Sequence, residues 1–599
     1  MRYLFLLLTM TGRVEAQDGA ALYKQRCASC HDSPAVRVPS LGAIKQMTAE
    51  AVYAALTNGV MKPQTSGLST QQVLSLVVYI APVGGAGARP AFEKSCTGNG
   101  AFTPSENAWG GWSPSITNSR FQDAKPSGIG AADVPRLKLK WAFNLGPVTM
   151  ARGQPVVAGN RVFAGTLAGD MYALDAATGC IYWAFKAGAG IRSGVTVGEA
   201  GGVPAIFFGD RSAVMYALNA DSGELIWRTR PVEHQLASVT ATPLFYKGVI
   251  YQGFASIEEA LVADPNAACC SFRGSVAALE ASSGRVLWQT YTIAEPAKPI
   301  GKQQGPSGAA IWSTPTIDER KGAIYVATGD NYSAPVTGTS DAVLALDLKT
   351  GKMLWSRQFT QGDAYNSGCS SRAHANCPNK EGPDFDFGQP PILVELGGGK
   401  RALVIAQKSG MVHAIDPDAE GQILWQRRVG TGGLLGGSQW GSAADNQRVY
   451  VAISDVIFHS VADAGGRRLV LDPKAGGGLD AIDLKSGTIV WSARPAKCAA
   501  TQAICSPAQS AAVTAIDGAV FSGSLDGHLR AYSATDGRVI WDFNTAREFP
   551  TVNGKPARGG SIDATGAAVA GGLVLIDAGY NQFGGMPGNV LLAFSVDGK

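Results

Sequence analysis

A short phrase repeated seven times constrains the fold of this chain more than any other feature. Each copy alternates apolar and polar residues, passes through a turn containing glycine and ends in tryptophan, as in YALDAATGCIYW and AALEASSGRVLW. The seven tryptophans are Trp183, Trp227, Trp288, Trp355, Trp425, Trp491 and Trp541. Each phrase is typical of a β-hairpin. Because repeats spaced about 40–70 residues apart form stacked or radial arrays, the pattern predicts a closed ring of four-stranded blades.

The two ends of the chain contain the halves of an eighth copy. The C-terminal LLAFSVDGK reaches Asp597 and Gly598 without a tryptophan, and LKLKWAFNL around Trp141 supplies the missing strand. A blade built from both ends would close the ring and remove two sheet edges. We therefore expect an all-β propeller of eight blades, preceded by a small all-α domain.

The length and composition agree with this organisation. A chain of 599 residues fits a propeller with one small additional domain. We expect the small domain at residues 17–82, a linker at 83–100 and the propeller at 101–599. The 75 glycines and the charged fraction of 16% suit tight-turned β structure. A net charge of +4 gives no basis for binding nucleic acid or an anionic membrane surface.

Residues 1–16 have the features of a secretory signal peptide. Arg2 precedes the apolar run YLFLLLTM, and Val14-Glu15-Ala16 offers small residues at the cleavage positions. The apolar run is too short to cross a bilayer, so we expect no membrane span. Export would place the mature protein in the periplasm, where disulfides form.

Cys27, Cys30 and His31 form the C-x-x-C-H motif of covalent haem attachment. Two thiols at this spacing bond to the haem vinyl groups, and the adjacent histidine supplies an iron ligand. The segment NGVMKPQTSGLS places Met61 on a loop rich in Gly and Pro. By resemblance to c-type cytochrome domains, this methionine is the second iron ligand of a haem c. Met47 is the competing ligand, with a role in the core as its alternative.

The other eight cysteines predict disulfides in an exported chain, although spacing does not prove their connectivity. Four candidate pairs account for them: Cys369 with Cys377, Cys498 with Cys505, Cys96 with Cys180, and the adjacent Cys269 and Cys270.

The repeats and the haem motif together resemble the pyrroloquinoline quinone (PQQ) alcohol dehydrogenases, which are eight-bladed propellers with repeats ending in tryptophan. Within that family, a cytochrome c domain ahead of the propeller is most similar to the polyvinyl alcohol dehydrogenases. The resemblance covers nearly the whole chain after residue 16. It implies PQQ, haem c and Ca²⁺ as cofactors.

Four residues match, in the family's order, positions that bind the quinone. Trp312, in GAAIWSTPTID, matches the tryptophan whose indole stacks under the planar cofactor. Arg192, in GIRSGV, matches the arginine that binds a cofactor carboxylate, and Thr240, in SVTATP, matches a hydroxyl contact to the same acid groups. Lys408, in AQKSGM, matches the Arg or Lys beside the quinone oxygens, where a positive charge stabilises the reacting carbonyl.

Calcium requires several oxygen ligands, and the family takes them from a Glu, an Asn and the catalytic Asp. Glu258, in GFASIEE, matches the Glu position, with Glu259 as the alternative. The Asn position falls on Asp330 when residues are counted without gaps and on Asn331 one residue later, so both stay open. Asp386 is the expected catalytic ligand.

The segment GPDFDFGQP resembles the family's W-D-F/Y segment, with Phe385 in place of Trp. Asp386 then occupies the position of the base that accepts the alcohol proton while hydride moves to the quinone, and Asp384 is the alternative acid. Gly388 stands where lanthanide-using relatives carry an extra Asp, which favours calcium.

The adjacent pair Cys269-Cys270 departs from the family pattern. Many family members carry a vicinal disulfide over the cofactor, shortly before the arginine matched by Arg192. In this chain the pair lies after Glu258 instead. Our hypothesis is that it caps or rims the cofactor from a different blade, and the alternative is an unrelated structural loop.

These matches imply an exported quinohaemoprotein dehydrogenase. It would oxidise secondary alcohol groups of polyvinyl alcohol by hydride transfer to PQQ, with electrons then passing singly to haem c and to an external cytochrome or other acceptor. The alternative is the same chemistry on a small primary alcohol, an aldehyde or a sugar. Two other classes are a binding propeller, which would lack the haem motif, and an electron carrier that binds no PQQ.

Overall fold

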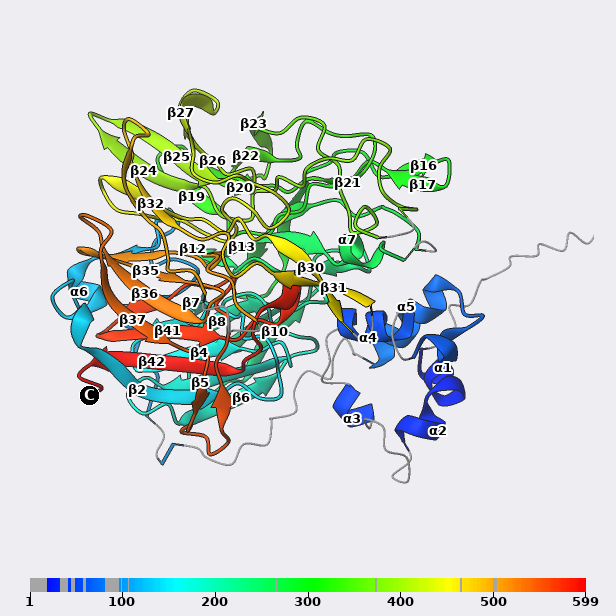
Figure 1. The fold of residues 1–599 in the computed structure, drawn as a ribbon, viewed down its shortest axis with the longest axis horizontal. Coiled ribbons are helices and arrows are strands. Elements are labelled where there is room, and N and C mark those ends of the chain that lie inside the picture. Colours follow the sequence, from blue (N-terminus) through cyan, green and yellow to red (C-terminus); the bar gives the residue numbers. More distant parts are fainter. Residues whose placement is uncertain are drawn as a thin grey trace, which may run out of the picture. The chain divides into compact units, whose positions relative to one another are not determined.

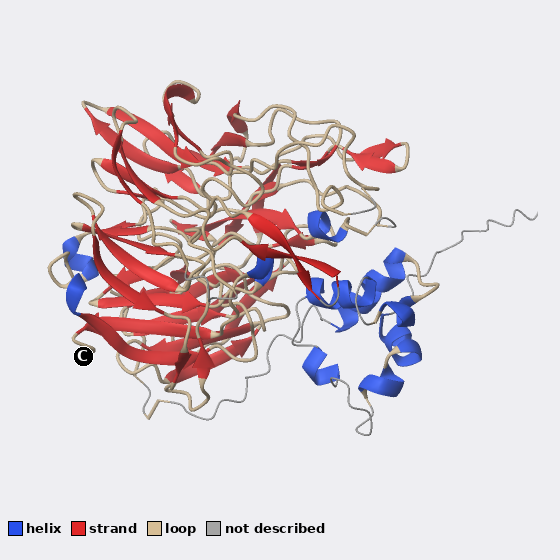
Figure 2. Cartoon of the chain, in the orientation of Figure 1, coloured by secondary structure: helices blue, strands red, loops and turns tan. Residues whose placement is uncertain are grey.

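The computed structural model describes residues 19–32, 41–44, 49–57, 61–80, 96–97, 100–105, 107–264, 267–371, 374–463, 466–498 and 504–599. The chain divides into two compact units, Met1–Val83 and Gly84–Lys599. The described part of the first unit is helical, and strands dominate the second (Figures 1 and 2). The expected signal peptide, Met47 and most of the expected linker lie outside the described residues.

The first unit contains short helices, which in chain order are α1 (Gly19–Arg26), α2 (Ala28–His31), α3 (Leu41–Ile44), α4 (Ala49–Thr57), η1 (Lys62–Thr65) and α5 (Thr70–Ile80). Helices α1 and α5 pack closely because Gly19 has no side chain. A Cβ at Gly19 would lie 2.1 Å from the Ser75 carbonyl oxygen. One turn further along, the rings of Tyr23 and Tyr79 lie 5.3 Å apart. The small all-α domain expected before the propeller is thus confirmed.

The second unit consists of eight four-stranded antiparallel blades, and the strands of each blade pair in the order in which they are named below. Blade 1 is β3 (Val156–Ala158), β4 (Arg161–Gly165), β5 (Asp170–Asp175) and β6 (Ile181–Lys186). Blade 2 is β7 (Thr196–Ala200), β8 (Val203–Gly209), β9 (Met215–Asn219) and β10 (Leu225–Thr229). Blade 3 is β12 (Leu244–Tyr246), β13 (Val249–Ser256), β14 (Ser275–Glu280) and β15 (Val286–Tyr291). Blade 4 is β19 (Thr316–Asp318), β20 (Ala323–Ala327), β22 (Ala342–Asp347) and β23 (Met353–Gln358).

The remaining blades follow the same pattern. Blade 5 is β24 (Ile392–Gly397), β25 (Lys400–Ala406), β26 (Met411–Asp416) and β27 (Gln422–Arg428). Blade 6 is β28 (Ala443–Ala444), β29 (Arg448–Ala452), β32 (Leu479–Asp483) and β33 (Ile489–Ala493). Blade 7 is β34 (Thr514–Ile516), β35 (Ala519–Gly523), β36 (His528–Ser533) and β37 (Val539–Asn544). Blade 8 is β40 (Ala568–Ala570), β41 (Leu573–Ala578), β42 (Val590–Val596) and β2 (Leu137–Asn144).

Shorter elements lie outside this pattern. The strands are β1 (Phe121–Gln122), β11 (Ala237–Ser238), β16 (Lys298–Ile300), β17 (Gln303–Gly305), β18 (Ser307–Gly308), β21 (Asn331–Ser333), β30 (Phe458–Asp463), β31 (Gly466–Leu471), β38 (Glu548–Phe549) and β39 (Ala557–Arg558). The helices are α6 (Ala124–Ser127), η2 (Val134–Arg136), α7 (Glu258–Leu261) and η3 (Gln582–Gly584).

Blade 8 closes the ring with strands from two distant parts of the chain. The early strand β2 pairs antiparallel with β42, the last strand, from Leu137 opposite Val596 to Asn144 opposite Val590. This pairing confirms the eighth blade expected from the two half-repeats.

The repeated tryptophans join each blade to the next. The Trp183 indole donates a hydrogen bond to the Ala220 carbonyl at 3.1 Å, and its ring packs on Gly223 in the next repeat. Gly223 has φ 73°, a conformation that side chains rarely adopt. The Trp541 indole donates to the Leu137 carbonyl of blade 8 at 3.0 Å, and the Trp141 indole of blade 8 completes the circle by donating to the Ala176 carbonyl of blade 1 at 3.1 Å.

We predict that Gly223→Ala destabilises the propeller more than Gly202→Ala. Both glycines have positive φ, 73° and 85°, so either alanine adds strain of about 1–2 kcal/mol. Only the Cβ at 223 meets an obstacle, 2.5 Å away in the Trp183 ring, whereas nothing lies within 4 Å at 202. Apparent midpoints of thermal unfolding should fall further for Gly223→Ala; equal losses would show that the tryptophan contact contributes nothing.

One irregular segment, residues 109–122, connects the first strands of several blades. Its backbone hydrogen-bonds to the first strands of six blades, at Val157, Val197, Ile317, Leu393, Ala444 and Ala515. Within it the buried Arg120 guanidinium donates to the Val513 carbonyl at 2.6 Å and lies 4.5 Å from the Trp112 ring centre. Arg120 therefore holds Trp112 in place within this segment.

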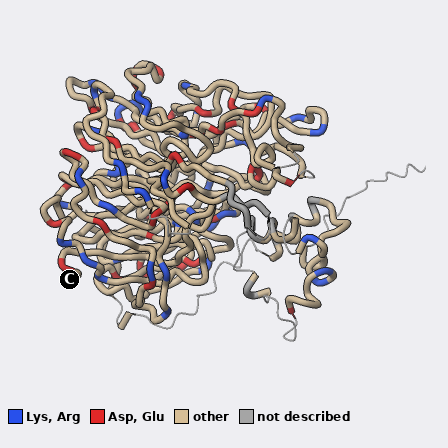
Figure 3. Tube along the Cα trace, in the orientation of Figure 1, with Lys and Arg blue, Asp and Glu red and all other residues tan. Residues whose placement is uncertain are grey.

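The surface carries both signs of charge. Lys and Arg are interspersed with Asp and Glu along the described trace (Figure 3). Among the described residues, no helix combines the length and apolar character that a bilayer crossing requires.

Candidate functional site

A pocket lies where several blades present the loop that precedes their first strand. Its wall includes Arg152, Arg192, Thr240, Trp312 and Trp440. Four of these residues stand four positions before the first strand of their blade, and Trp440 stands three before β28. The structure thus brings together three residues that the sequence selected, Arg192, Thr240 and Trp312.

Three pocket residues were missed by the sequence reasoning: Trp112, Arg152 and Trp440. The signal that could have found Arg152 and Trp440 is their place just before a blade's first strand, which Trp312 and Arg192 share. Trp112 carries no such signal, because it belongs to the irregular segment 109–122.

The two arginines give one side of the pocket a positive charge. The Arg192 and Arg152 guanidinium carbons lie 5.1 and 5.4 Å from the Trp440 ring centre. Burial, with a smaller contribution from Arg152, lowers the pKa of Arg192 to about 9. The Trp440 indole is fixed by a 2.9 Å hydrogen bond to Asp563. Two guanidinium groups on one wall suit an anionic ligand.

Several donors in the pocket wall have no acceptor within the described part of the chain. These buried atoms are Trp112 Nε1, Arg152 Nε, Trp312 Nε1, Ser313 Oγ and Thr565 Oγ1. Buried polar groups are normally paired. Their convergence fits a planar ligand with many acceptor oxygens, and PQQ carries three carboxyl groups and two quinone oxygens.

A lysine and two aspartates form a buried ion-pair cluster beside Trp312. Lys408, in the turn between β25 and β26, donates to Asp386 Oδ2 at 2.6 Å and to Asp384 Oδ1 at 2.7 Å. Its ammonium lies 5.0 Å from the Trp312 ring centre. Burial opposes the charge on Lys408, but the two aspartates raise its pKa well above the ordinary value. Asp386 also accepts a 2.7 Å hydrogen bond from the Asp330 amide.

Asp330, Asp384 and Asp386 present carboxylate oxygens that all lie within 4.8 Å of one another. All three residues are 1% exposed. Asp330 Oδ2 and Asp384 Oδ2 have no partner among the described residues. Burial and the neighbouring carboxylates raise the pKa of Asp330 well above its ordinary value. Three buried carboxylates, two of which have an unused oxygen, fit a hard divalent cation such as Ca²⁺.

The structure distinguishes between Asp330 and Asn331, the two candidates for one calcium-ligand position that the sequence left open. The Asn331 side chain donates to the Ser307 carbonyl at 2.9 Å and accepts from the Thr337 amide at 2.8 Å. The nitrogen and the oxygen of the Asn331 side chain are therefore both already hydrogen-bonded to backbone atoms of neighbouring segments. Asp330 is the residue of the two that belongs to the acidic cluster.

Glu258 and Glu259 also differ in their surroundings. The Glu258 carboxylate accepts hydrogen bonds from the Ser271 and Phe272 amides, each at 2.9 Å. The Glu259 carboxylate interacts electrostatically with the cluster: burial and the charge of Asp386 raise its pKa to about 7, against the opposing effect of Lys408. Glu258 is thus held by a neighbouring loop, whereas the charge of Glu259 interacts with those of Asp386 and Lys408 in the acidic cluster.

The first unit presents the haem motif with both thiols free. Cys27 is buried and Cys30 exposed, and they are the two of the ten cysteines that form no disulfide. The His31 amide donates to the Cys27 carbonyl at 3.0 Å, in the turn that leads from α1 into α2. Met61 caps η1 after the helix α4. Two free thiols at this spacing fit covalent attachment of haem.

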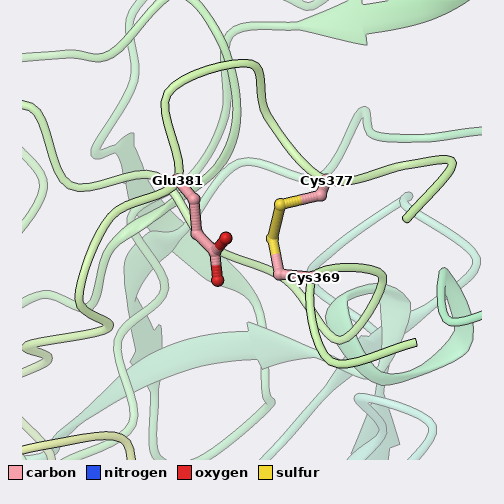
Figure 4. A group of neighbouring side chains, drawn as sticks. All are labelled: Cys369, Cys377 and Glu381. Carbon is pink, nitrogen blue, oxygen red and sulfur yellow. A yellow bond between two sulfur atoms is a disulfide. The ribbon is translucent and has the colours of Figure 1, made fainter. Parts of the chain in front are cut away.

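All four expected disulfides are present: Cys96–Cys180, Cys269–Cys270, Cys369–Cys377 and Cys498–Cys505. Figure 4 shows Cys369–Cys377 beside Glu381; because both sulfurs are bonded to each other, this group offers no thiolate to a metal.

The Cys269–Cys270 disulfide is not part of the pocket wall. It is buried in an apolar cluster with Phe272 and Tyr332, and Trp312 packs against that cluster. The hypothesis that it caps or rims the cofactor finds no support in the pocket lining.

Comparison with known families agrees with both units. Residues 109–426 match the family described as glucose/ethanol/alcohol dehydrogenase, beta-propeller domain. Residues 14–80 match cytochrome c oxidase, cbb3-type, subunit III. Residues 455–588 match the outer membrane protein assembly factor BamB, which the propeller repeat explains.

Two similar proteins cover nearly the whole chain. A polyvinylalcohol dehydrogenase of Pseudomonas sp. is 42% identical over 97% of this chain and 94% of its own length. A second, from Sphingopyxis sp. (strain 113P3), is 37% identical over 97% and 93%. The solved quinohemoprotein alcohol dehydrogenase of Comamonas testosteroni has the same fold, with a TM-score of 0.62 and 19% identity over 84% of this chain and 82% of that one. The expected family is therefore confirmed: this chain belongs to the PQQ-dependent alcohol dehydrogenases with a cytochrome c domain, of the polyvinyl alcohol dehydrogenase type.

Proposed function

We propose that this protein oxidises secondary alcohol groups, of polyvinyl alcohol in the first place, with PQQ in the propeller pocket and haem c on the first unit. The observation that carries the proposal is Asp386, which lies beside the pocket floor Trp312 and is held by both Lys408 and the Asp330 amide. The substrate is inferred from the two polyvinylalcohol dehydrogenases that this chain resembles over 97% of its length. The second candidate is the same chemistry on a small primary alcohol, an aldehyde or a sugar.

Asp386 is the general base in this proposal. Its Oδ1 is oriented by the Asp330 amide and its Oδ2 by Lys408, so the carboxylate has one fixed orientation. A positioned carboxylate that accepts the alcohol proton makes the carbon a better hydride donor. PQQ, when bound, accepts that hydride as a two-electron acceptor. The Lys408 ammonium would stabilise negative charge on an oxygen above Trp312.

Calcium would be held by Asp330, Asp384 and Asp386, whose carboxylate oxygens lie within 4.8 Å of one another. Glu259, whose charge interacts with that of Asp386, would be a further ligand. A bound divalent cation would supply partners for the unused Asp330 and Asp384 oxygens.

The acid groups of the cofactor would lie on the wall formed by Arg152, Arg192 and Thr240. Guanidinium groups bind carboxylates through paired hydrogen bonds that an ammonium cannot reproduce. Arg152 is oriented by a 2.8 Å hydrogen bond to Gln582, and Arg192 has no such side-chain partner within the described residues.

We predict that Arg192→Gln weakens PQQ binding by roughly 10- to 100-fold, the value of one charge-assisted hydrogen bond of about 1.5–3 kcal/mol. Fluorescence quenching of the pocket tryptophans by PQQ measures the affinity. Arg211→Gln is the matched control, because Arg211 precedes β9 in the same blade without lining the pocket. Equal affinities for Arg192→Gln and the unmodified protein would remove Arg192 from the cofactor site.

The first unit would carry electrons away from the propeller. Cys27 and Cys30 would attach the haem covalently, and His31 and Met61 would be its iron ligands. A haem so held would supply one-electron chemistry at a potential raised by the His/Met ligand pair. An external cytochrome or other acceptor would receive them. Export to the periplasm is supported by the four disulfides, which form in oxidising compartments.

The experiment that tests the substrate class compares donors on one preparation. The full chain, produced with haem-maturation machinery and loaded with PQQ and Ca²⁺, is offered polyvinyl alcohol, a small secondary alcohol and ethanol in turn. We expect the highest kcat/KM per hydroxyl group with the secondary alcohols. A preference for ethanol would favour the second candidate.

A further inference from the structure

Glu258 and Glu259 are consecutive residues at the start of α7, yet their carboxylates have different partners. Consecutive residues on a helix point about 100° apart. Glu258 is 4% exposed, and it accepts the Ser271 and Phe272 amides at 2.9 Å each. It also accepts the Ser271 hydroxyl at 3.3 Å. Glu258 therefore fastens the segment 269–273 to the helix that carries Glu259.

The segment 269–273 is itself hydrogen-bonded to the hairpin of β16 and β17. Cys269 and Cys270 are joined by a disulfide, and their backbone pairs with Gln304, whose amide donates to the Cys269 carbonyl at 2.6 Å. Both cysteines are 1% exposed. A helix of four residues such as α7 has little stability of its own. Its orientation must come from such contacts with fixed structure.

A second series of contacts connects the segment 269–273 with the acidic cluster. The Phe272 ring stacks on Tyr332, with centroids 6.3 Å apart and planes inclined by 22°. Phe272 is fully buried and Tyr332 is 1% exposed. Tyr332 belongs to β21, which begins directly after Asp330. Phe272 is thus connected with Asp330 through Tyr332.

We propose that Glu258 is a positioning residue for the calcium site: by holding the Ser271 and Phe272 amides it orients Glu259 through α7 and Asp330 through the Phe272–Tyr332 stack. The inference rests on the proposed function of the acidic cluster. Residues that orient metal ligands typically change metal affinity by about 10- to 100-fold when they are replaced. Glu258 acts on the ion through two neighbours and does not touch it.

The test measures Ca²⁺ affinity by calorimetry on the full-length, PQQ-loaded protein after calcium is removed with a chelator. Glu258→Gln keeps the size of the side chain but turns an N–H₂ group toward one of the two amides. We expect its Kd for Ca²⁺ to rise about 10- to 100-fold. Glu258→Asp, which keeps the carboxylate, should recover part of the loss. Glu199→Gln, at an exposed position on β7, is the matched control and should bind as the unmodified protein does.

Hydrogen exchange at two amides separates positioning from a general loss of stability. The Ser271 and Phe272 amides should exchange faster in Glu258→Gln and keep their protection in Glu259→Gln, while both variants bind calcium more weakly. If Glu258→Gln does not fold, Phe272→Leu, which removes the stack on Tyr332 and leaves the Glu258 contacts in place, should also weaken calcium binding.

Three results would overturn the inference. An unchanged Kd in Glu258→Gln or, if that variant does not fold, in Phe272→Leu would show that the segment 269–273 does not position the ligands. Loss of binding in Glu258→Gln together with normal binding in Glu259→Gln would make Glu258 a calcium ligand itself. If the unmodified protein binds no calcium, the proposed calcium site is overturned together with this inference. The first two results would overturn the inference alone.

Discussion

Asp386→Asn is expected to retain PQQ and to lose alcohol oxidation by at least about 10²- to 10⁴-fold, the contribution of a positioned general base. The asparagine oxygen can still accept from one of the two donors that hold Asp386, Lys408 and the Asp330 amide, and its N–H₂ group faces the other. The volume of the side chain is unchanged, so the pocket should still bind PQQ. The asparagine cannot accept the alcohol proton. Stopped-flow measurement of cofactor reduction by alcohol, in protein whose PQQ content has been determined, gives the rate directly.

Asp384→Asn is the matched control for this prediction. Asp384 holds the same lysine at 2.7 Å and lies in the same cluster, two residues away in sequence. We expect the control to keep much more activity than Asp386→Asn, because Lys408 and the base remain paired. An active Asp386→Asn variant together with an inactive Asp384→Asn variant would assign the base to Asp384.

Replacing Cys27 and Cys30 together by alanine should abolish electron delivery to an external acceptor. Without the two thiols the haem has no covalent attachment. The change lies in the first unit, so a single turnover of alcohol oxidation in the propeller should proceed at its normal rate. Pyridine haemochrome spectra measure attached haem, and reduction of an added cytochrome measures delivery.

The matched control for this prediction is a double replacement of Cys498 and Cys505, a disulfide of the second unit with a sequence separation of 7. It should keep attached haem and electron delivery. Undiminished cytochrome reduction by the Cys27/Cys30 variant would show that electrons leave the propeller without passing through the haem.

The fold could be predicted from the sequence because the interaction that builds it is local and repeated. Each blade needs a tryptophan and a glycine turn in the following repeat, as Trp183 and Gly223 show. The half-repeat at Trp141 and the truncated end at Gly598 then had to meet in one blade. The disulfide pairs were predictable for a related reason, since two of them close loops with sequence separations of 8 and 7.

The candidate site was predictable where a residue's place in its repeat sets its place in space. Arg192, Thr240 and Trp312 each stand four positions before a first strand and so converge on the pocket. The choice between Glu258 and Glu259 could not be made in this way. It depends on the segment 269–273, which follows an irregular stretch and contacts α7 through amides that no residue pattern reveals.

The absorbance of the haem after alcohol is added to the full chain tests the whole electron path, from the alcohol through PQQ to the first unit. The protein is prepared with covalent haem in four forms: complete, without PQQ, without Ca²⁺, and as Asp386→Asn. We predict haem reduction by polyvinyl alcohol or a small secondary alcohol in the complete form alone. Haem that stays oxidised in the complete form with every donor, or that is reduced equally without PQQ, would contradict the proposed function.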